Sequence, residues 1–211
     1  MKFTCRQKNK GMTFLELTVV ISIFAIVSSI TIFNYKTFQA KVDIRNLAND
    51  VASKFTQAQR RALFGDLHPQ GGIDWRPAYG LSFDLTPSTD TDNKTFYYFV
   101  DLDQEKDFDS QVYECNLYGT SECLEKVVIG RGDYVRSIEV YFEGEPNPQY
   151  INSRLDIVYT RPNAGAFFSS PELLEPFIAP ISYARVQLAA TEPTDLASSI
   201  KIYASGRIQV E

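Results

Sequence analysis

The chain has 211 residues, enough to bury a substantial core, and its composition of 44% hydrophobic and 13% aromatic residues argues against a disordered protein. Its formal net charge of −5 disfavours a general nucleic-acid binder, which is usually basic. One His and three Cys leave little material for a zinc site or a histidine-dependent active site.

Charged and apolar residues are unevenly distributed near the start of the chain. The first ten residues contain no acid and four cations, which are Lys2, Arg6, Lys8 and Lys10. The following segment, residues 12–33, contains a single ionisable side chain, Glu16. Because four of the 21 Lys and Arg residues and none of the 26 acids precede Gly11, residues 12–211 carry a formal charge of −9. The sequence therefore divides into a cationic leader (residues 1–11), an apolar segment and an acidic remainder.

The apolar segment is long enough to cross a membrane as a helix. At about 1.5 Å of rise per residue, a helix needs roughly 20 apolar residues to span a bilayer. The cationic leader orients the segment with the leader in the cytoplasm and the acidic remainder exported. A cleaved signal peptide and a plain membrane anchor are the simple alternatives, and Ala25 and Ser28 offer only weak signal-peptide cleavage sites.

Glu16 is not explained by either of these alternatives. A carboxylate inside a membrane-spanning helix costs about 2.5–3.5 kcal/mol on insertion scales, so it usually has a function. Glu16 is the fifth residue after Gly11, and the string from Lys10 to Leu17 resembles the processing site of type IV prepilins. This resemblance implies cleavage between Gly11 and Met12 by prepilin peptidase, followed by N-methylation of Met12.

The resemblance also implies how the processed chain assembles. Cleavage before the apolar segment leaves the membrane anchor attached and creates a cationic amine at Met12. In the interior of a filament, an ammonium and a carboxylate each need a partner. We therefore expect Glu16 of one subunit to pair with the amine of a neighbour and to set the axial register. The implied partners are other pilins or pseudopilins, an inner-membrane assembly platform, and membrane lipid before assembly.

Residues 34–64 continue the helical pattern with a more polar composition. Apolar side chains recur at helical spacing on one face, at Ile44, Leu47, Val51, Phe55, Ala58 and Ala62. No proline precedes Pro69, and Gly65 with Pro69 forms a stop signal. We expect one helix over residues 12–64, with a membrane and assembly part (12–33) and an amphipathic part (34–64).

Beyond residue 75 the pattern changes to short strands separated by clusters of Pro, Gly, Asn and Asp. The predicted strands cover residues 79–84, 95–102, 126–129, 135–142, 154–160, 184–189, 200–204 and 207–210. Alternating apolar residues in several of them indicate sheets with one face on a core. The predicted fold class is α+β, in which a long N-terminal helix, its apolar half spanning a membrane, packs against an antiparallel head over residues 75–211.

Two strings in this head are similar to hairpins of the GspH/FimT family, the H-type minor pseudopilins of type II secretion and related minor pilins. One runs from Leu155 to Gly165, and the other runs from Ile200 to Val210 with Gly206 at its turn. This second resemblance implies a subunit that initiates or caps a type II secretion pseudopilus or a type IV pilus. The sequence does not separate these two systems. The implied location is the cytoplasmic membrane, with a single pass and the head in the periplasm or outside the cell, and then the filament.

The cysteines suggest a small covalent loop. Cys115 and Cys123 enclose seven residues, and in an oxidising compartment they could form a disulfide, with free thiols as the alternative. Cys5 lies in the leader and would be removed by cleavage, which leaves an even number of cysteines.

Five acids alternate along one short stretch, at Asp101, Asp103, Glu105, Asp107 and Asp109. Oxygen ligands at such spacing could hold calcium, but the stretch lacks the glycine and the terminal glutamate of an EF-hand loop. A solvated acidic turn is the simpler interpretation, and we predict no metal.

No catalytic constellation or phosphate-binding loop occurs in the sequence, so we expect a structural subunit without a cofactor rather than an anchored enzyme. The alternative function is a minor pilin that binds DNA during uptake. Its cationic patch would use Arg60 and Arg61 near the helix end with Lys201 and Arg207 in the last hairpin. The charge of −9 on residues 12–211 opposes this alternative.

Overall fold

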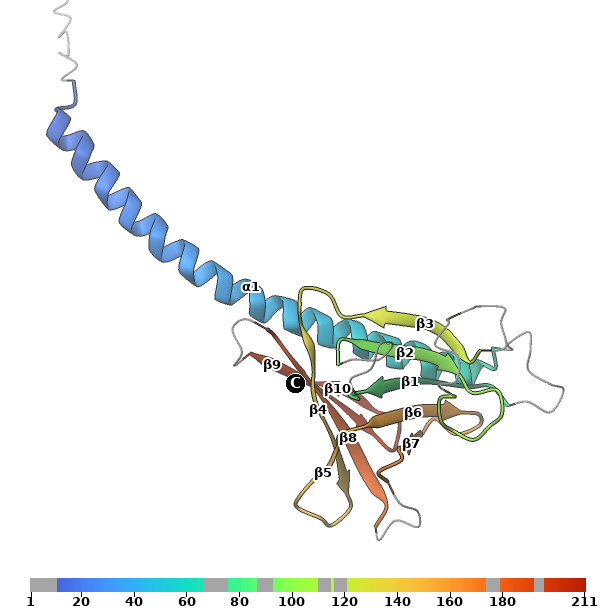
Figure 1. Ribbon diagram of the computed structural model, residues 1–211. Helices are drawn as coiled ribbons and strands as arrows, with labels where there is room; N and C mark the ends of the chain where they lie inside the picture. Colours follow the sequence, from blue (N-terminus) through green and yellow to red (C-terminus); the bar gives the residue numbers. More distant parts are fainter. Residues whose placement is uncertain are drawn as a thin grey trace, which may run out of the picture. The chain divides into compact units, whose positions relative to one another are not determined.

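The computed structural model describes residues 11–66, 76–86, 93–109, 115, 121–173, 179–191 and 196–211, except the side chains of residues 31–34. Within these residues it contains one α-helix and ten β-strands in two antiparallel sheets, which confirms the predicted α+β class (Figure 1). The chain divides into two compact units, Met1–Gln39 and Ala40–Glu211, and each is described here by itself.

Helix α1 runs from Phe14 to Phe64 and supplies residues to both units. In the first unit the large apolar side chains that the structure describes on this helix are exposed; Phe14, for example, is 82% exposed and Phe24 is 72% exposed. By length and composition α1 is able to cross a membrane, since an 18-residue window of this helix has a mean hydropathy of 2.2. None of that window is buried in the structure. Apolar side chains without a protein partner need lipid or other subunits to cover them.

In the second unit α1 is amphipathic. The buried side chains on its inner face are Ile44, Ala48, Val51, Phe55, Ala58 and Ala62. Five of these six were predicted; Leu47 is only partly buried, and Ala48 takes the fully buried place beside it. The helix ends at Gly65, the first residue of the predicted stop signal, which adopts a φ of +75°, and Pro69 lies outside the described residues.

The first sheet has the strand order β3-β2-β1-β6-β7, and every pair in it is antiparallel. Its strands are β1 (Ala78–Asp84), β2 (Thr95–Val100), β3 (Cys123–Val128), β6 (Arg154–Thr160) and β7 (Ala166–Ser169). Strand β7 follows β6 through the turn that contains Pro162 and Gly165, and it was not predicted.

The second sheet has the order β10-β9-β8-β4-β5 and is also antiparallel. Its strands are β4 (Tyr134–Phe142), β5 (Gln149–Ile151), β8 (Ile181–Ala189), β9 (Ala197–Tyr203) and β10 (Ile208–Val210). Each of the eight predicted strands overlaps an observed strand, and β5 is the second strand that was not predicted. The β9–β10 hairpin turns at Gly206, which has a φ of +86°, as expected from the sequence.

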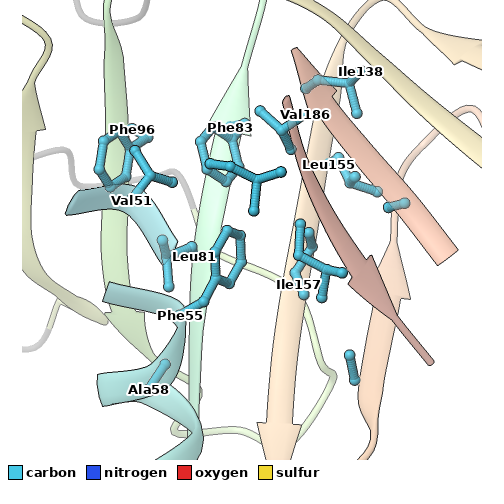
Figure 2. Packing of buried hydrophobic residues seen from close by; sticks show 14 of the residues in the cluster. Val51, Phe55, Ala58, Leu81, Phe83, Phe96, Ile138, Leu155, Ile157 and Val186 are labelled. Carbon is cyan, nitrogen blue, oxygen red and sulfur yellow. The ribbon is translucent and has the colours of Figure 1, made fainter. Parts of the chain in front are cut away.

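The second unit has one main hydrophobic core, to which α1 and both sheets contribute (Figure 2). The Phe55 ring of α1 stacks on Phe83 of β1 with 5.9 Å between ring centroids, and Phe83 stacks on Phe96 of β2 at 5.2 Å. From the second sheet, Ile138 and Val186 enter the same cluster. Because α1 provides one wall of this core, the helix is part of the folded head and not only its anchor.

Candidate functional site

The predicted cleavage site lies immediately before α1. Gly11, Met12 and Thr13 are outside the helix, and all three are exposed. A peptide bond in non-helical, exposed backbone has no helical hydrogen bonds to break before a peptidase can bind it. The Gly11–Met12 bond is therefore in a conformation that an enzyme can reach.

Thr13 and Glu16 form a reciprocal capping box at the start of α1. The backbone amide and the hydroxyl of Thr13 donate to Glu16 Oε2 at 3.0 and 3.2 Å, and the Glu16 amide donates to Thr13 Oγ1 at 3.3 Å. The Thr13 carbonyl accepts the first helical hydrogen bond, from the Leu17 amide at 3.1 Å. This pattern satisfies amides that the first turn of a helix otherwise leaves unpaired, so it fixes the helix start.

The assembly role of Glu16 was predicted from its spacing from Gly11, but its contact with Thr13 was not predicted. The signal is present in the sequence, because a Thr followed three residues later by a Glu, just before an apolar run, is the usual capping box. The structure brings the predicted assembly carboxylate to the first turn of the helix, three residues after Thr13 and four residues after Met12.

Cys115 and Cys123 are joined by a disulfide, with 4.5 Å between their Cα atoms. Cys123 is the first residue of β3 and is fully buried beside Phe108, so the bond ties the segment before β3 to the sheet. Cys5 lies outside the residues that the structure describes.

The acidic stretch does not act as one group. Asp101 and Asp103 meet Glu122, a contact that the spacing of the acids does not predict, and one oxygen from each of the three lies within 4.8 Å of the others. Among the described residues, this carboxylate trio has the close oxygens that a metal ion needs. Asp107 instead forms an ion pair with Arg154, with 3.5 Å between Asp107 Oδ2 and Arg154 Nη2.

Two members of this trio are buried and bound by backbone amides. Glu122 accepts from the Leu102 amide at 2.8 Å and from the Asp109 amide at 3.0 Å, and Asp101 accepts from the Gln104 amide at 2.7 Å. Removal from water raises the pKa of Glu122 to about 7 and that of Asp101 to about 7. The carboxyl groups thus hold the turn after β2 in place.

The cations of the DNA-binding alternative are only partly available. Lys201 Nζ lies 2.9 Å from Glu211 Oε1, and Arg61 Nε lies 3.1 Å from Asp66 Oδ2. The Cζ atom of Arg207 lies 3.8 Å from the centroid of the Tyr203 ring, and Arg60 is exposed. Since two of the four cations have a carboxylate partner, the arrangement does not favour a phosphate-binding surface.

A comparison with known protein families matches the first of these sites. Residues 6–32 match a family model described as the prokaryotic N-terminal methylation motif. The matched segment contains Gly11, Met12, Thr13 and Glu16, and the match supports a type IV pilin-like prepilin. No curated protein and no solved structure matches the chain.

Proposed function

We propose that the chain is a minor pilin or pseudopilin, a structural subunit in the initiation or tip complex of a type II secretion pseudopilus or a type IV pilus. The observation that carries this proposal is the succession of three features: an exposed, non-helical Gly11–Met12 bond, a capped Glu16, and an exposed apolar helix that continues into a folded head. We place the unassembled subunit in the cytoplasmic membrane with a single pass, its head in the periplasm or outside the cell.

The physical argument starts from the exposed apolar half of α1. Before assembly, lipid covers these side chains; in a filament, the same side chains of neighbouring subunits cover one another. Both environments exclude water, so the carboxylate of Glu16 and the amine created at Met12 are more stable together than apart. Pairing between subunits gives the helices a preferred axial register, which apolar contacts alone specify weakly.

The proposal that the chain is a minor subunit is based on two hairpins of the head. The β6–β7 and β9–β10 hairpins are the elements whose sequences resemble the GspH/FimT family, and the side chain of Gln59 on α1 donates to the turn of each, at 3.0 Å to Ala164 O and 3.0 Å to Gly206 O. A role that depends on contacts between subunits requires no catalytic group, and we propose that the chain is not an enzyme.

The cleavage step is tested by replacing the residue before the scissile bond. Gly11→Leu places a bulky side chain at the peptidase site, so the chain is expected to accumulate as the uncleaved precursor, about 11 residues longer on a gel or by mass spectrometry. Gly130→Leu, at an exposed glycine with open space around its Cβ position, is the matched control and should be cleaved normally. Normal cleavage of the Gly11→Leu chain would remove the prepilin interpretation.

The assembly step is tested at Glu16. Glu16→Ala is expected to insert and to be cleaved, because the leader and Gly11 are intact, and yet to be absent from sheared filaments. Glu145→Ala removes an exposed carboxylate from the head and should enter filaments as the wild type does. Filaments that contain normal amounts of the Glu16→Ala chain would contradict the pairing argument.

A further inference from the structure

The capping box leaves the two oxygens of Glu16 in different situations. Both hydrogen bonds from Thr13 end on Oε2, one from the backbone amide and one from the hydroxyl. None of the hydrogen bonds between described residues ends on Oε1. Since a carboxylate has about four acceptor positions, Glu16 is able to keep both bonds to Thr13 and still accept another donor.

A glutamate held in this way is better prepared for pairing than a free one. An unrestrained Glu side chain samples several rotamers and loses that freedom when it binds a partner. The two bonds to Thr13 hold the carboxyl group at the helix start before any partner arrives. The loss of side-chain entropy on assembly is therefore smaller. The carboxylate also keeps two hydrogen bonds while the unassembled subunit is in lipid.

We propose that Thr13 is a positioning residue for Glu16, holding Oε2 so that Oε1 is available to the methylated Met12 amine of a neighbouring subunit. This inference rests on the proposed function, because it assumes that Glu16 pairs across subunits. Its content is separate: a residue that is not itself a member of the ion pair determines how efficiently the pair forms.

A purely structural role of Thr13 as a helix cap is the competing explanation, and the choice of variants separates the two. Thr13→Val removes the hydroxyl at nearly constant shape, so it loses the cap and the hydroxyl bond to Glu16 and keeps only the bond from the backbone amide. Glycine is almost as good an N-cap as threonine, so Thr13→Gly largely keeps the helix start but has no hydroxyl to donate. Thr13→Ser keeps both functions.

The experiment measures the amount of each variant in sheared filaments, divided by the amount of mature subunit in the membrane, so that any loss of cleavage cancels. We expect Thr13→Val and Thr13→Gly each to fall about tenfold, which corresponds to about 1.4 kcal/mol of lost pairing free energy, and Thr13→Ser to stay within twofold of the wild type. Thr18→Val is the matched control, because the Thr18 hydroxyl donates at 2.8 Å to the Leu15 carbonyl of the same helix and not to Glu16. It should assemble normally.

Amide hydrogen exchange of the mature chain in detergent micelles supplies the second readout. Loss of the cap in Thr13→Val should reduce protection of the Leu17 amide, which donates to the Thr13 carbonyl at the helix start, by about fivefold, whereas Thr13→Gly should change it by less than twofold. Normal assembly of Thr13→Gly would overturn the positioning role and leave Thr13 as a cap. If Glu16→Ala assembles normally as well, the proposed function fails; if Glu16→Ala is excluded while both Thr13 variants assemble, only the positioning inference fails.

Discussion

Glu122 binds residues that lie up to 22 positions earlier in the chain. Its backbone carbonyl accepts the Val100 amide at 2.9 Å, and its carboxylate accepts the amides of Leu102 and Asp109. One of its carboxylate oxygens also lies within 4.8 Å of an oxygen of Asp101 and of Asp103. One buried side chain thus sets the path of the turn that follows β2.

This arrangement makes the stability of the head depend on pH. Burial raises the pKa of Glu122 to about 7, so between the ordinary carboxyl range and pH 7 the folded chain keeps a proton that the unfolded chain releases. The free energy of unfolding contributed by this group is fully present below the unfolded pKa and is lost as the pH rises towards 7 and beyond. Asp101 acts in the same direction.

Glu122→Gln is therefore expected to make the decrease in unfolding midpoint between pH 5 and pH 8 smaller than in the wild type. The amide is uncharged, but its nitrogen cannot accept the Asp109 amide, so the variant is also less stable at every pH and the slope is the quantity to compare. Glu145→Gln, at an exposed position, should keep the wild-type slope. Thermal unfolding of the full chain in detergent measures both, and an unchanged slope for Glu122→Gln would contradict the argument.

The two glutamates show what the sequence reveals at the residue scale. Glu16 was found because its meaning depends on local spacing from Gly11 within one apolar run. The grouping of Glu122 with Asp101 depends on how β3 pairs with β2, which the spacing of acids along the chain does not contain. The alternating acids 101–109 therefore suggested a local turn, and the contact across strands was missed.

At the scale of elements, α1 contributes to the head through a few large buried side chains. Phe55 is fully buried and stacks on Phe83, whereas Phe64 at the end of the same helix is 82% exposed. Phe55→Ala is expected to lower the free energy of unfolding by about 3–5 kcal/mol, because it leaves a cavity in the core. Phe64→Ala should change it by less than about 0.5 kcal/mol. Denaturant unfolding in detergent measures the difference, and equal effects would mean that α1 does not form a wall of the core.

The β9–β10 hairpin depends on a glycine for two independent reasons. Gly206 has a left-handed φ of +86°, and a Cβ at this position would overlap the Ala164 carbonyl oxygen of the neighbouring turn. Gly206→Ala is expected to cost about 3 kcal/mol, from backbone strain and overpacking together.

Gly144 provides the matched comparison for this prediction. Its φ of +80° is nearly the same, but a Cβ there would meet nothing within 4 Å, so Gly144→Ala should cost only the backbone term of about 1 kcal/mol. Unfolding midpoints of the two alanine variants measure the packing contribution by difference. Equal losses at both positions would show that the close approach to Ala164 is relieved without cost.

Element prediction from the sequence was most successful where a pattern is long. The helix and eight of the ten strands were predicted from the sequence, and the three-residue β10 was among them as part of the hairpin that turns at Gly206. Strands β5 and β7 have three and four residues, too few for alternation to stand out, and they exist because β4 and β6 offer edges to pair with. On the helix, the larger Leu47 was predicted to be buried and Ala48 was not, although close packing favours a small side chain at position 48.

At the scale of the whole molecule, charge decides against the DNA-binding alternative. Residues 12–211 carry −9, and Lys201 and Arg61 each have a carboxylate partner. The purified mature chain is expected to give no shift of double-stranded DNA in a gel, even at low salt, where phosphate contacts are strongest. A shift that disappears at higher salt and is lost in Arg207→Gln would reverse this prediction.

The order of strands along the chain also determines when the head is able to fold. The first sheet takes β1, β2, β3, β6 and β7, and the second takes β4, β5, β8, β9 and β10, so each sheet is interrupted in sequence by strands of the other. Strand β1 pairs with β6, about 75 residues later, and β4 pairs with the later strand β8. A nascent chain that has not yet reached β8 consequently exposes unpaired edges in the second sheet and lacks one side of the core. We therefore expect the head to complete its fold only after β8, β9 and β10 have been made, near the end of synthesis.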